Sequence, residues 1–250
     1  MQSFSYKAKA ELCRTAVQRL CCARAECYGV LLYCNTFTMQ EVRIITENPE
    51  FAARLPRLFH RAFNVKFDRL PTEEAPGSKL IFQITDPEKL RRIMDTLGYD
   101  PRQSLVLHVN FAMLEEDCCR MSFLRGAFLA GGSVTDPEKR YHLELSTSHV
   151  QASREVSALL QEMGFLPRSV MRGGSAVIYF KQSEHIEDLL TTLGAPVAAT
   201  EIMTAKVDKE IRNGANRAMN CDMANVNKTL DAVAAQQEAI EKLEKAGQLE

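Results

Sequence analysis

The sequence predicts an α+β fold made of two similar halves and followed by a helical C-terminal segment. Two observations support a duplication. The adjacent cysteines Cys21-Cys22 recur as Cys118-Cys119, and Gly29 recurs as Gly126 at the same offset. Near the ends of the two halves, Leu97-Gly98 recurs as Leu193-Gly194. A drift of a single residue in the offset, together with a shared order of elements, indicates an internal repeat.

The composition is that of an ordinary globular chain. Of the 250 residues, 46% are apolar and 25% charged, and the formal net charge is −1. A balanced charge gives no whole-chain field that would steer the protein to nucleic acid or to a membrane, although a local basic patch remains compatible with it. No run approaches the roughly 18 apolar residues of a membrane span, and the N-terminus lacks an apolar signal region. We therefore expect a cytoplasmic protein without membrane partners.

The first half, residues 1–98, is expected to alternate helices with strands. An amphipathic helix is expected from Ser5, as its N-cap, to about Arg19, and the repeated helix follows from about Leu20 to Asn35. The remaining expected elements are a strand over 38–46, a helix over 48–64 with a kink or break at Pro56, a hairpin of strands 65–70 and 79–85 around a turn at 71–78, and a helix from Asp86 to Gly98, where glycine is a favourable C-terminal residue.

The second half, residues 99–195, repeats this order. The expected elements are the repeated helix over 116–131, a strand over 140–147, a helix that ends at Gly164, strands over 165–171 and 176–181, and a helix from Ser183 to Gly194. Each half thus reads αββαββα, with a weaker first strand in each pair. Helices on one face of a sheet make an α+β layer arrangement, and the two halves would bury their apolar faces against each other in a pseudo-two-fold domain.

The repeated helices have the composition of a close helix–helix seam. Ser122, Gly126 and Ala130 recur every four residues and so share one face, and Ala25 and Gly29 match the first two. Small residues let two backbones approach closely. Glycine inside a helix costs about 1 kcal/mol relative to alanine, so its presence needs a packing reason. We expect these five residues to form the seam.

The run from Phe123 to Val134, Phe-Leu-Arg-Gly-Ala-Phe-Leu-Ala-Gly-Gly-Ser-Val, resembles the signature helix of the LAGLIDADG homing endonucleases. In that family an acidic residue just before the final glycine binds the catalytic metal. The resemblance places Gly131 at this position, and Cys34 at its counterpart in the first copy. Magnesium prefers hard oxygen ligands, which glycine lacks and which the soft sulfur of cysteine replaces poorly. We therefore expect no catalytic residue, no metal and no cofactor.

Other candidate chemistry is weaker. Asp136, in Asp136-Pro137-Glu138, is either a displaced metal ligand or part of a turn, and the turn is favoured because Asp-Pro is typical of turns. The His142–Glu144 pair is interpreted as a surface contact on one strand. The eight cysteines contain no CxxC pair and have no nearby histidine in sequence, so zinc spacing is not met. We expect reduced thiols that pack as small apolar side chains.

The C-terminal segment, residues 196–250, has a different composition. Asparagine is frequent from Asn213 to Asn227. The segment from Lys206 to Lys228 contains five Lys or Arg and three acidic residues, a net charge of +2. Such residues can contact phosphates and base edges of DNA; the alternative is an Asn-rich loop that caps adjacent helices. The candidate DNA-binding residues are Lys206, Lys209, Arg212, Asn213, Asn216, Arg217, Asn220, Asn225 and Lys228.

Taken together, the chain resembles the WhiA family of bacterial sporulation and cell-division transcription regulators over its whole length. The resemblance rests on Ser3-Phe4-Ser5 with Lys9-x-Glu11-Leu12, on Arg125 to Val134, on Asp136-Pro137 with Tyr141 to Glu144, and on Asn216-Arg217 with Asn220-Cys221 and Ala224-Asn225. It implies a degenerate endonuclease-like domain joined to a C-terminal helix-turn-helix domain, binding to double-stranded promoter DNA and no nuclease activity. Because the chain ends at Glu250, we expect that second domain to be incomplete.

Three functions are therefore compared. The first is a DNA-binding transcription regulator, associated with the nucleoid. The second is a scaffold that docks on other transcription or cell-division proteins without binding DNA itself. The third, an active homing endonuclease, is disfavoured by the missing acids. The expected strands carry mixed charges, with Glu144 opposite no clear base, so residues 1–195 are expected to bind DNA weakly and in a strongly salt-dependent way.

Overall fold

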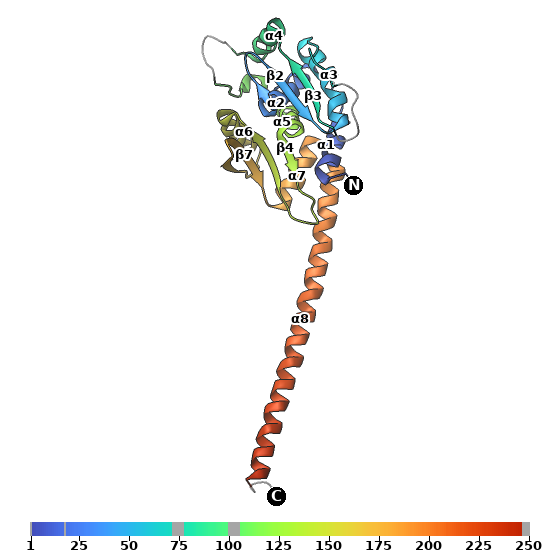
Figure 1. Ribbon diagram of the computed structural model, residues 1–250, viewed down its shortest axis with the longest axis vertical. Coiled ribbons are helices and arrows are strands. Elements are labelled where there is room, and N and C mark those ends of the chain that lie inside the picture. The colour runs from blue at the N-terminus through green and yellow to red at the C-terminus, as the bar shows by residue number, and fades with distance from the viewer. Residues whose placement is uncertain (1, 18, 72–77, 100–105, 247–250) are drawn as a thin grey trace. The chain divides into compact units, whose positions relative to one another are not determined.

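The structure is a computed structural model that describes residues 2–17, 19–71, 78–99 and 106–246. The chain divides into two compact units, Met1–Met203 and Thr204–Glu250. The first holds both sequence repeats and is an α+β structure; the second is a single helical segment. Figure 1 labels the elements along the chain.

The first repeat follows a helix, α1 (Phe4–Cys13), that is shorter than the one predicted to reach about Arg19. Its N-cap is Ser3, not the predicted Ser5, because the Ser3 side chain accepts the hydrogen bond from the backbone N–H of Tyr6. Its elements are α2 (Leu20–Tyr33), β1 (Thr36–Phe37), β2 (Val42–Thr46), α3 (Pro49–Phe63), β3 (Leu80–Ile84) and α4 (Pro87–Leu97). The strands form an antiparallel sheet in the order β1-β2-β3, with Ile44 opposite Phe82. Gly98 ends α4 in the left-handed conformation, as expected for a helix C-terminus.

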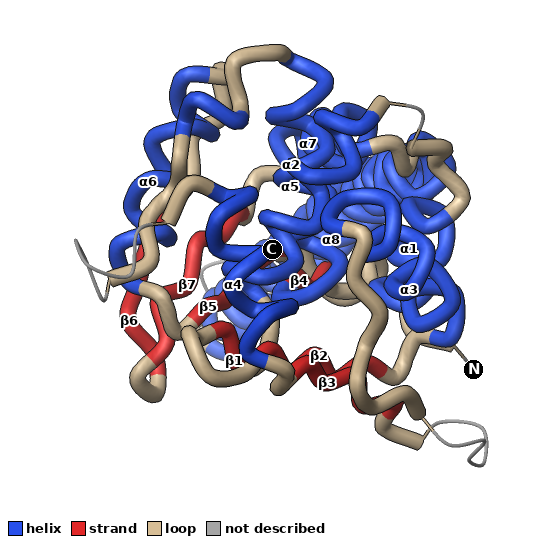
Figure 2. The backbone as a smooth tube through the Cα atoms, turned by 90° about the horizontal axis from the view of Figure 1, so that it is seen from above, coloured by secondary structure: helices blue, strands red, loops and turns tan. Residues whose placement is uncertain are grey.

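The second repeat gives the same sequence of elements with one strand more. It contains η1 (Phe111–Met113), α5 (Asp117–Gly131), β4 (Gly132–Val134), β5 (Leu143–Thr147), α6 (Val150–Glu162), β6 (Arg168–Arg172), β7 (Ser175–Phe180) and α7 (Ser183–Leu193). Its antiparallel sheet has the order β4-β5-β7-β6. Figure 2 shows the strands gathered along one side of the first unit and helices covering the other, the layering predicted from the sequence.

The strand predicted over 65–70 is wrong. The residues that the structure describes there form only an isolated bridge between Arg69 and Gln83. Val65 and Phe67 are buried as the alternation required. Asp68, however, accepts hydrogen bonds from the backbone of Thr85 and Asp86 and pairs with Lys89. These contacts replace a regular ladder. The turn predicted at 71–78 falls largely on 72–77, outside the described residues.

Two smaller expectations also differ. The break predicted at Pro56 does not occur, because α3 is continuous from Pro49 to Phe63; its strongly amphipathic face buries Leu55, Phe59 and Phe63 and holds the helix together despite the proline. The Asn-rich loop considered for the C-terminal segment is also wrong, since residues 196–245 form one helix, α8 (Pro196–Lys245).

The start of α8 belongs to the first unit. The carboxylate of Glu11 accepts hydrogen bonds from the backbone N–H groups of Val197 and Ala198, at 2.8 and 3.0 Å, and so caps the free donors of the first turn. Ala198, Ala199 and Ile202 are buried. The first compact unit therefore extends to Met203. No helix of the described residues combines the length and apolar character that crossing a membrane requires.

Candidate nucleic-acid interface

The centre of the first unit is the contact between α2 and α5. A Cβ atom added to Gly29 would lie 1.9 Å from the carbonyl oxygen of Phe123, and one added to Gly126 would lie 2.0 Å from that of Glu26. No larger residue fits at either position without moving a backbone. Ala25 and Ser122 are buried in the same region, whereas Ala130 is partly buried against the core. The two helices thus contact through their backbones.

A buried ion cluster at this seam was not found from the sequence. Glu26 is fully buried, and its two carboxylate oxygens accept hydrogen bonds from Nε and Nη2 of Arg54 at 2.6 and 2.9 Å. Arg125 on α5 lies 3.5 Å from the same carboxylate. Both guanidinium groups also donate to backbone carbonyl oxygens. Arg54 donates to those of Cys13 and Thr15, and Arg125 donates to that of Leu193. The cluster is hydrogen-bonded as buried charges require and is therefore structural.

The two positions of the missing acids lie at the C-terminal ends of α2 and α5. Cys34 is buried, and its Sγ donates to the carbonyl oxygens of Leu31 and Thr36, both at 3.2 Å. Burial raises the pKa of this thiol to about 12, so it stays protonated. A Cβ at Gly131 would lie 2.4 Å from the carbonyl oxygen of Ser146 and 2.8 Å from that of Tyr33. Backbone occupies the space that an acidic side chain would need.

Asp136 has the geometry of a turn residue. Its carboxylate accepts a hydrogen bond from the backbone N–H of Glu138 at 2.9 Å, and its carbonyl accepts from Lys139 and Arg140. The side chain is exposed beyond the end of α5. These contacts favour the turn over the displaced metal ligand.

Glu144 on the second sheet has a basic partner, Arg172, that the sequence did not predict. Glu144 was expected to have no basic partner, but Arg172 lies 3.3 Å from its carboxylate and His142 lies 3.0 Å from it. Burial acts to raise the pKa of Glu144, yet the hydrogen bond and charge of His142 and then the charge of Arg172 bring it below its usual value. Arg168 on the edge strand is exposed on the same sheet.

The candidate DNA-binding residues all lie on α8. Lys206, Lys209, Asn213, Asn216 and Asn220 recur at intervals of three and four residues. This spacing places them along one stripe of a helix with 3.6 residues per turn. From Asn213 onward their side chains are exposed, and those of Lys206 and Lys209 are partly exposed. A continuous polar stripe with basic residues is suited to a DNA groove.

The remaining candidates divide between this stripe and other faces. Arg217 follows Asn213 by four residues and donates to its carbonyl at 3.2 Å, so it borders the stripe. Lys228 extends the same side of the helix eleven residues further, and Arg212 borders the stripe on its other side. Asn225 follows Asn220 by five residues, about 140° around the helix. The helix geometry therefore separates Asn225 from Asn220 and the rest of the stripe, although Lys228, three residues further along, is its neighbour on the helix surface.

A second stripe on α8 is apolar, and it borders the polar stripe where Met223 follows Asn216 by seven residues. Ile211, Ala215, Met219, Met223 and Val226 recur at intervals of four, four, four and three, and Leu230 and Val233 continue the series. All are exposed. A continuous apolar stripe on an otherwise polar helix is the pattern of a helix that packs against protein on one side.

Comparison with known proteins agrees with this architecture. The model of the WhiA LAGLIDADG-like domain matches residues 120–212, and that of the WhiA C-terminal HTH domain matches residues 215–250. The solved full-length DUF199/WhiA from Thermatoga maritima has a TM-score of 0.71 at 20% identity, covering 98% of this chain and 80% of that one. The solved N-terminal LAGLIDADG domain of DUF199/WhiA gives 0.60 at 18%, covering 78% and 94%. The predicted fold class is confirmed.

A sequence relative supplies the family. The probable cell division protein WhiA of Ruminiclostridium cellulolyticum is 34% identical over 249 residues, which are 97% of this chain and 80% of the relative. The family predicted from the sequence motifs is therefore confirmed, and the chain belongs to the WhiA family.

Proposed function

We propose that this protein is a DNA-binding transcription regulator of bacterial cell division and sporulation, associated with the nucleoid. The observation that carries the proposal is the polar stripe of α8, Lys206 to Asn220, within and just before a segment that matches the HTH domain of its family. Lysine neutralises phosphates, and asparagine can form two hydrogen bonds with an adenine edge. The partner that fits both side-chain types is double-stranded promoter DNA.

The test is fluorescence anisotropy of labelled promoter fragments with the whole chain. Asn220→Ala should raise the Kd by the equivalent of about 1–3 kcal/mol if Asn220 contacts a base. Asn225→Ala is the matched control, because it removes the same side chain from another face of the same helix. Equal weakening by both substitutions, or no weakening by either, would contradict the assignment of the stripe to DNA.

We further propose that the endonuclease-like domain has lost phosphodiester hydrolysis. Hydrolysis of this kind needs carboxylates that hold divalent cations. The support is local: backbone fills the space at Gly131, and the Cys34 thiol is buried and protonated. Incubation with magnesium and supercoiled DNA should give neither nicked nor linear product. Metal-dependent cleavage that disappears in Asp136→Ala would show instead that a displaced acid does the chemistry.

A second candidate function is a scaffold for transcription or cell-division proteins. The apolar stripe from Ile211 to Val233 favours it, because that stripe offers a surface for packing against protein. The two candidates differ in the binding assay. A scaffold predicts that the polar stripe can be changed without effect on any promoter fragment, whereas a regulator predicts sequence-dependent binding that Asn220→Ala weakens.

A further inference from the structure

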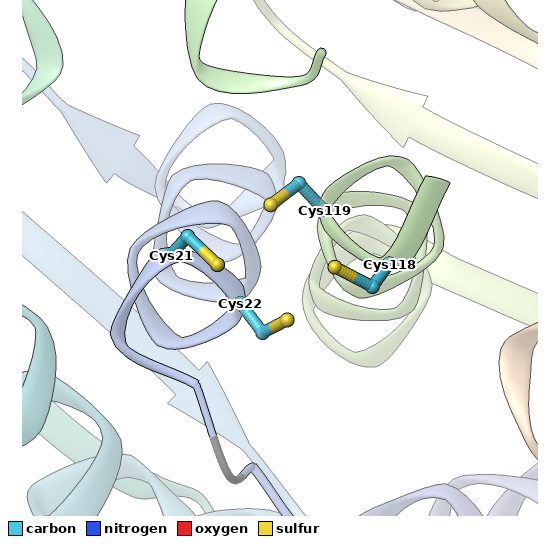
Figure 3. Close-up of side chains that lie close together, drawn as sticks. All are labelled: Cys21, Cys22, Cys118 and Cys119. Carbon is cyan, nitrogen blue, oxygen red and sulfur yellow. The ribbon is translucent and has the colours of Figure 1, made fainter. Parts of the chain in front are cut away.

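Four cysteines from the two repeats meet at one place in the first unit. Cys21 and Cys22 lie in the first turn of α2, and Cys118 and Cys119 lie in the first turn of α5. Their four Sγ atoms all lie within 4.8 Å of one another. Figure 3 shows the side chains pointing into the space between the two helix ends. The duplication produces this arrangement, because each repeat supplies one adjacent pair.

We propose that these four thiols form a binding site for one thiophilic divalent metal ion of the zinc class, which joins the N-terminal ends of α2 and α5. Zinc in structural sites is tetrahedral, with zinc–sulfur distances of about 2.3 Å. That geometry requires sulfur atoms about 3.8 Å apart, which follows from the same bond length. Sulfur atoms that lie within 4.8 Å of one another need to close by at most about 1 Å to reach this spacing.

The surroundings of the four thiols act on them in both directions. Burial raises the pKa of the Cys22 and Cys119 thiols, whereas hydrogen bonds with Cys22 and Arg19 lower the pKa of the Cys118 thiol. Both cysteine pairs lie at helix N-termini, where unpaired backbone N–H groups and the helix dipole favour negative charge. Neither helix has a side chain that caps these donors. Arg19 adds a positive charge, its Nη1 being 3.6 Å from Sγ of Cys118. Four thiolates and one divalent cation carry a net charge of about −2. Arg19 offsets part of it, whereas Asp117 in the first turn of α5 adds a negative charge.

The ion has a route to the site, and binding needs no oxidant. Cys21 is exposed, and a hollow at the surface is lined in part by Cys21, Cys119, Glu115 and Glu116. All four cysteines are free thiols. One zinc ion therefore forms four zinc–sulfur bonds and releases four protons, with no change in oxidation state. Forming two disulfides from the four thiols would require an oxidant, whereas binding a metal ion does not.

The proposed site differs from the expectation of packing thiols without metal spacing. That expectation considered ligands within one segment, where zinc pairs usually have the form CxxC. Here no segment has that form, and the tetrad exists only because α2 and α5 pack side by side. The remaining described cysteines, Cys13, Cys27, Cys34 and Cys221, lie outside the cluster.

The test uses cobalt(II) and zinc(II) as probes on the whole chain, purified with a chelator and a reductant. Cobalt should bind one ion per chain and give the visible absorption bands of tetrahedral thiolate coordination. One equivalent of zinc should abolish those bands. Zinc should also raise the Tm in a concentration-dependent manner, as a ligand of the native state does.

The variant pair Cys22→Ser and Cys118→Ser, one from each repeat, should each lose the cobalt bands and the zinc-dependent rise in Tm. Cys221→Ser, an exposed cysteine on α8, is the matched control and should retain both. The far-ultraviolet circular dichroism of each variant establishes that it is folded.

Two results would overturn the site. One is a fully reduced chain that gives no cobalt bands at stoichiometric metal. The other is retention of the bands in a folded Cys22→Ser/Cys118→Ser double variant. A mass lower by about 4 Da in chain purified without reductant, with no bound metal, would assign the tetrad to two disulfides instead.

Discussion

The α2–α5 pair and α8 place similar residues in opposite environments, buried in the first case and exposed in the second. In both, small or polar side chains recur at intervals of three or four residues along one stripe. In α2 and α5 that stripe is buried, and carbonyl oxygens of one helix occupy the space beside glycines of the other. In α8, a Cβ added to Gly214 would meet nothing within 4 Å. The same periodicity therefore marks a packing seam in one region and belongs to an exposed helix in the other.

The largest expected effect lies in the buried seam. Glu26→Gln would leave Arg54 and Arg125 without their carboxylate, and breaking a buried pair by removing one partner typically costs about 3–5 kcal/mol. Urea unfolding followed by circular dichroism measures the loss. A loss of less than about 1 kcal/mol in the free energy of unfolding would contradict this, because it would mean that water reaches the two arginines and replaces the carboxylate of Glu26.

The next effect compares two helical glycines directly. Gly29→Ala places a Cβ against the backbone of Phe123 and should destabilise the first unit by about 1–3 kcal/mol, as overpacking of a core does. Gly214→Ala should instead favour local helix formation by about 1 kcal/mol. Urea unfolding gives the first value, and hydrogen exchange of α8 amides gives the second. Equal responses at the two sites would remove the distinction between seam and stripe.

A smaller effect concerns charge on α8. Lys209→Ala should weaken DNA binding across sequences and reduce the slope of log K against log salt by about 1, the change for one lost phosphate contact. Lys242→Ala is the control, because Lys242 lies near the end of the helix and pairs with Glu238 at 2.7 Å. If both variants have the slope of the native chain, the stripe does not contact phosphates.

The smallest effect is a pH dependence in the second sheet. The pKa of Glu144 is lowered in the folded state by its partners His142 and Arg172. Its contribution to stability is therefore present at neutral pH and is lost as pH falls below about 4.3, the unfolded value, and through the folded value. Because Glu144 is only partly buried, Glu144→Gln should change stability by less than about 1 kcal/mol. Acid unfolding curves of the two proteins should converge at low pH.

Prediction of the fold succeeded where the signal was local. Gly98 and Gly194 adopt positive φ angles at the ends of α4 and α7, where glycine avoids strain. Prediction failed over 65–70, although the alternation of Val65 and Phe67 was interpreted correctly as burial. The side chain of Asp68 bonds to a distant turn, and a contact of that kind leaves no periodic trace in the sequence.

The sequence by itself determined that the chain is duplicated, that its repeated helices carry glycines at equivalent positions, and that its motifs are those of the WhiA family. Periodicity and motif order are properties of one segment at a time, so they can be interpreted without coordinates. Only the tertiary structure decided that backbone fills the space at Gly131 and that two arginines pair with Glu26. It also decided that two cysteine pairs, 97 residues apart in the sequence, lie next to each other. Each of these depends on the close approach of α2 and α5, which spacing along a single segment does not encode.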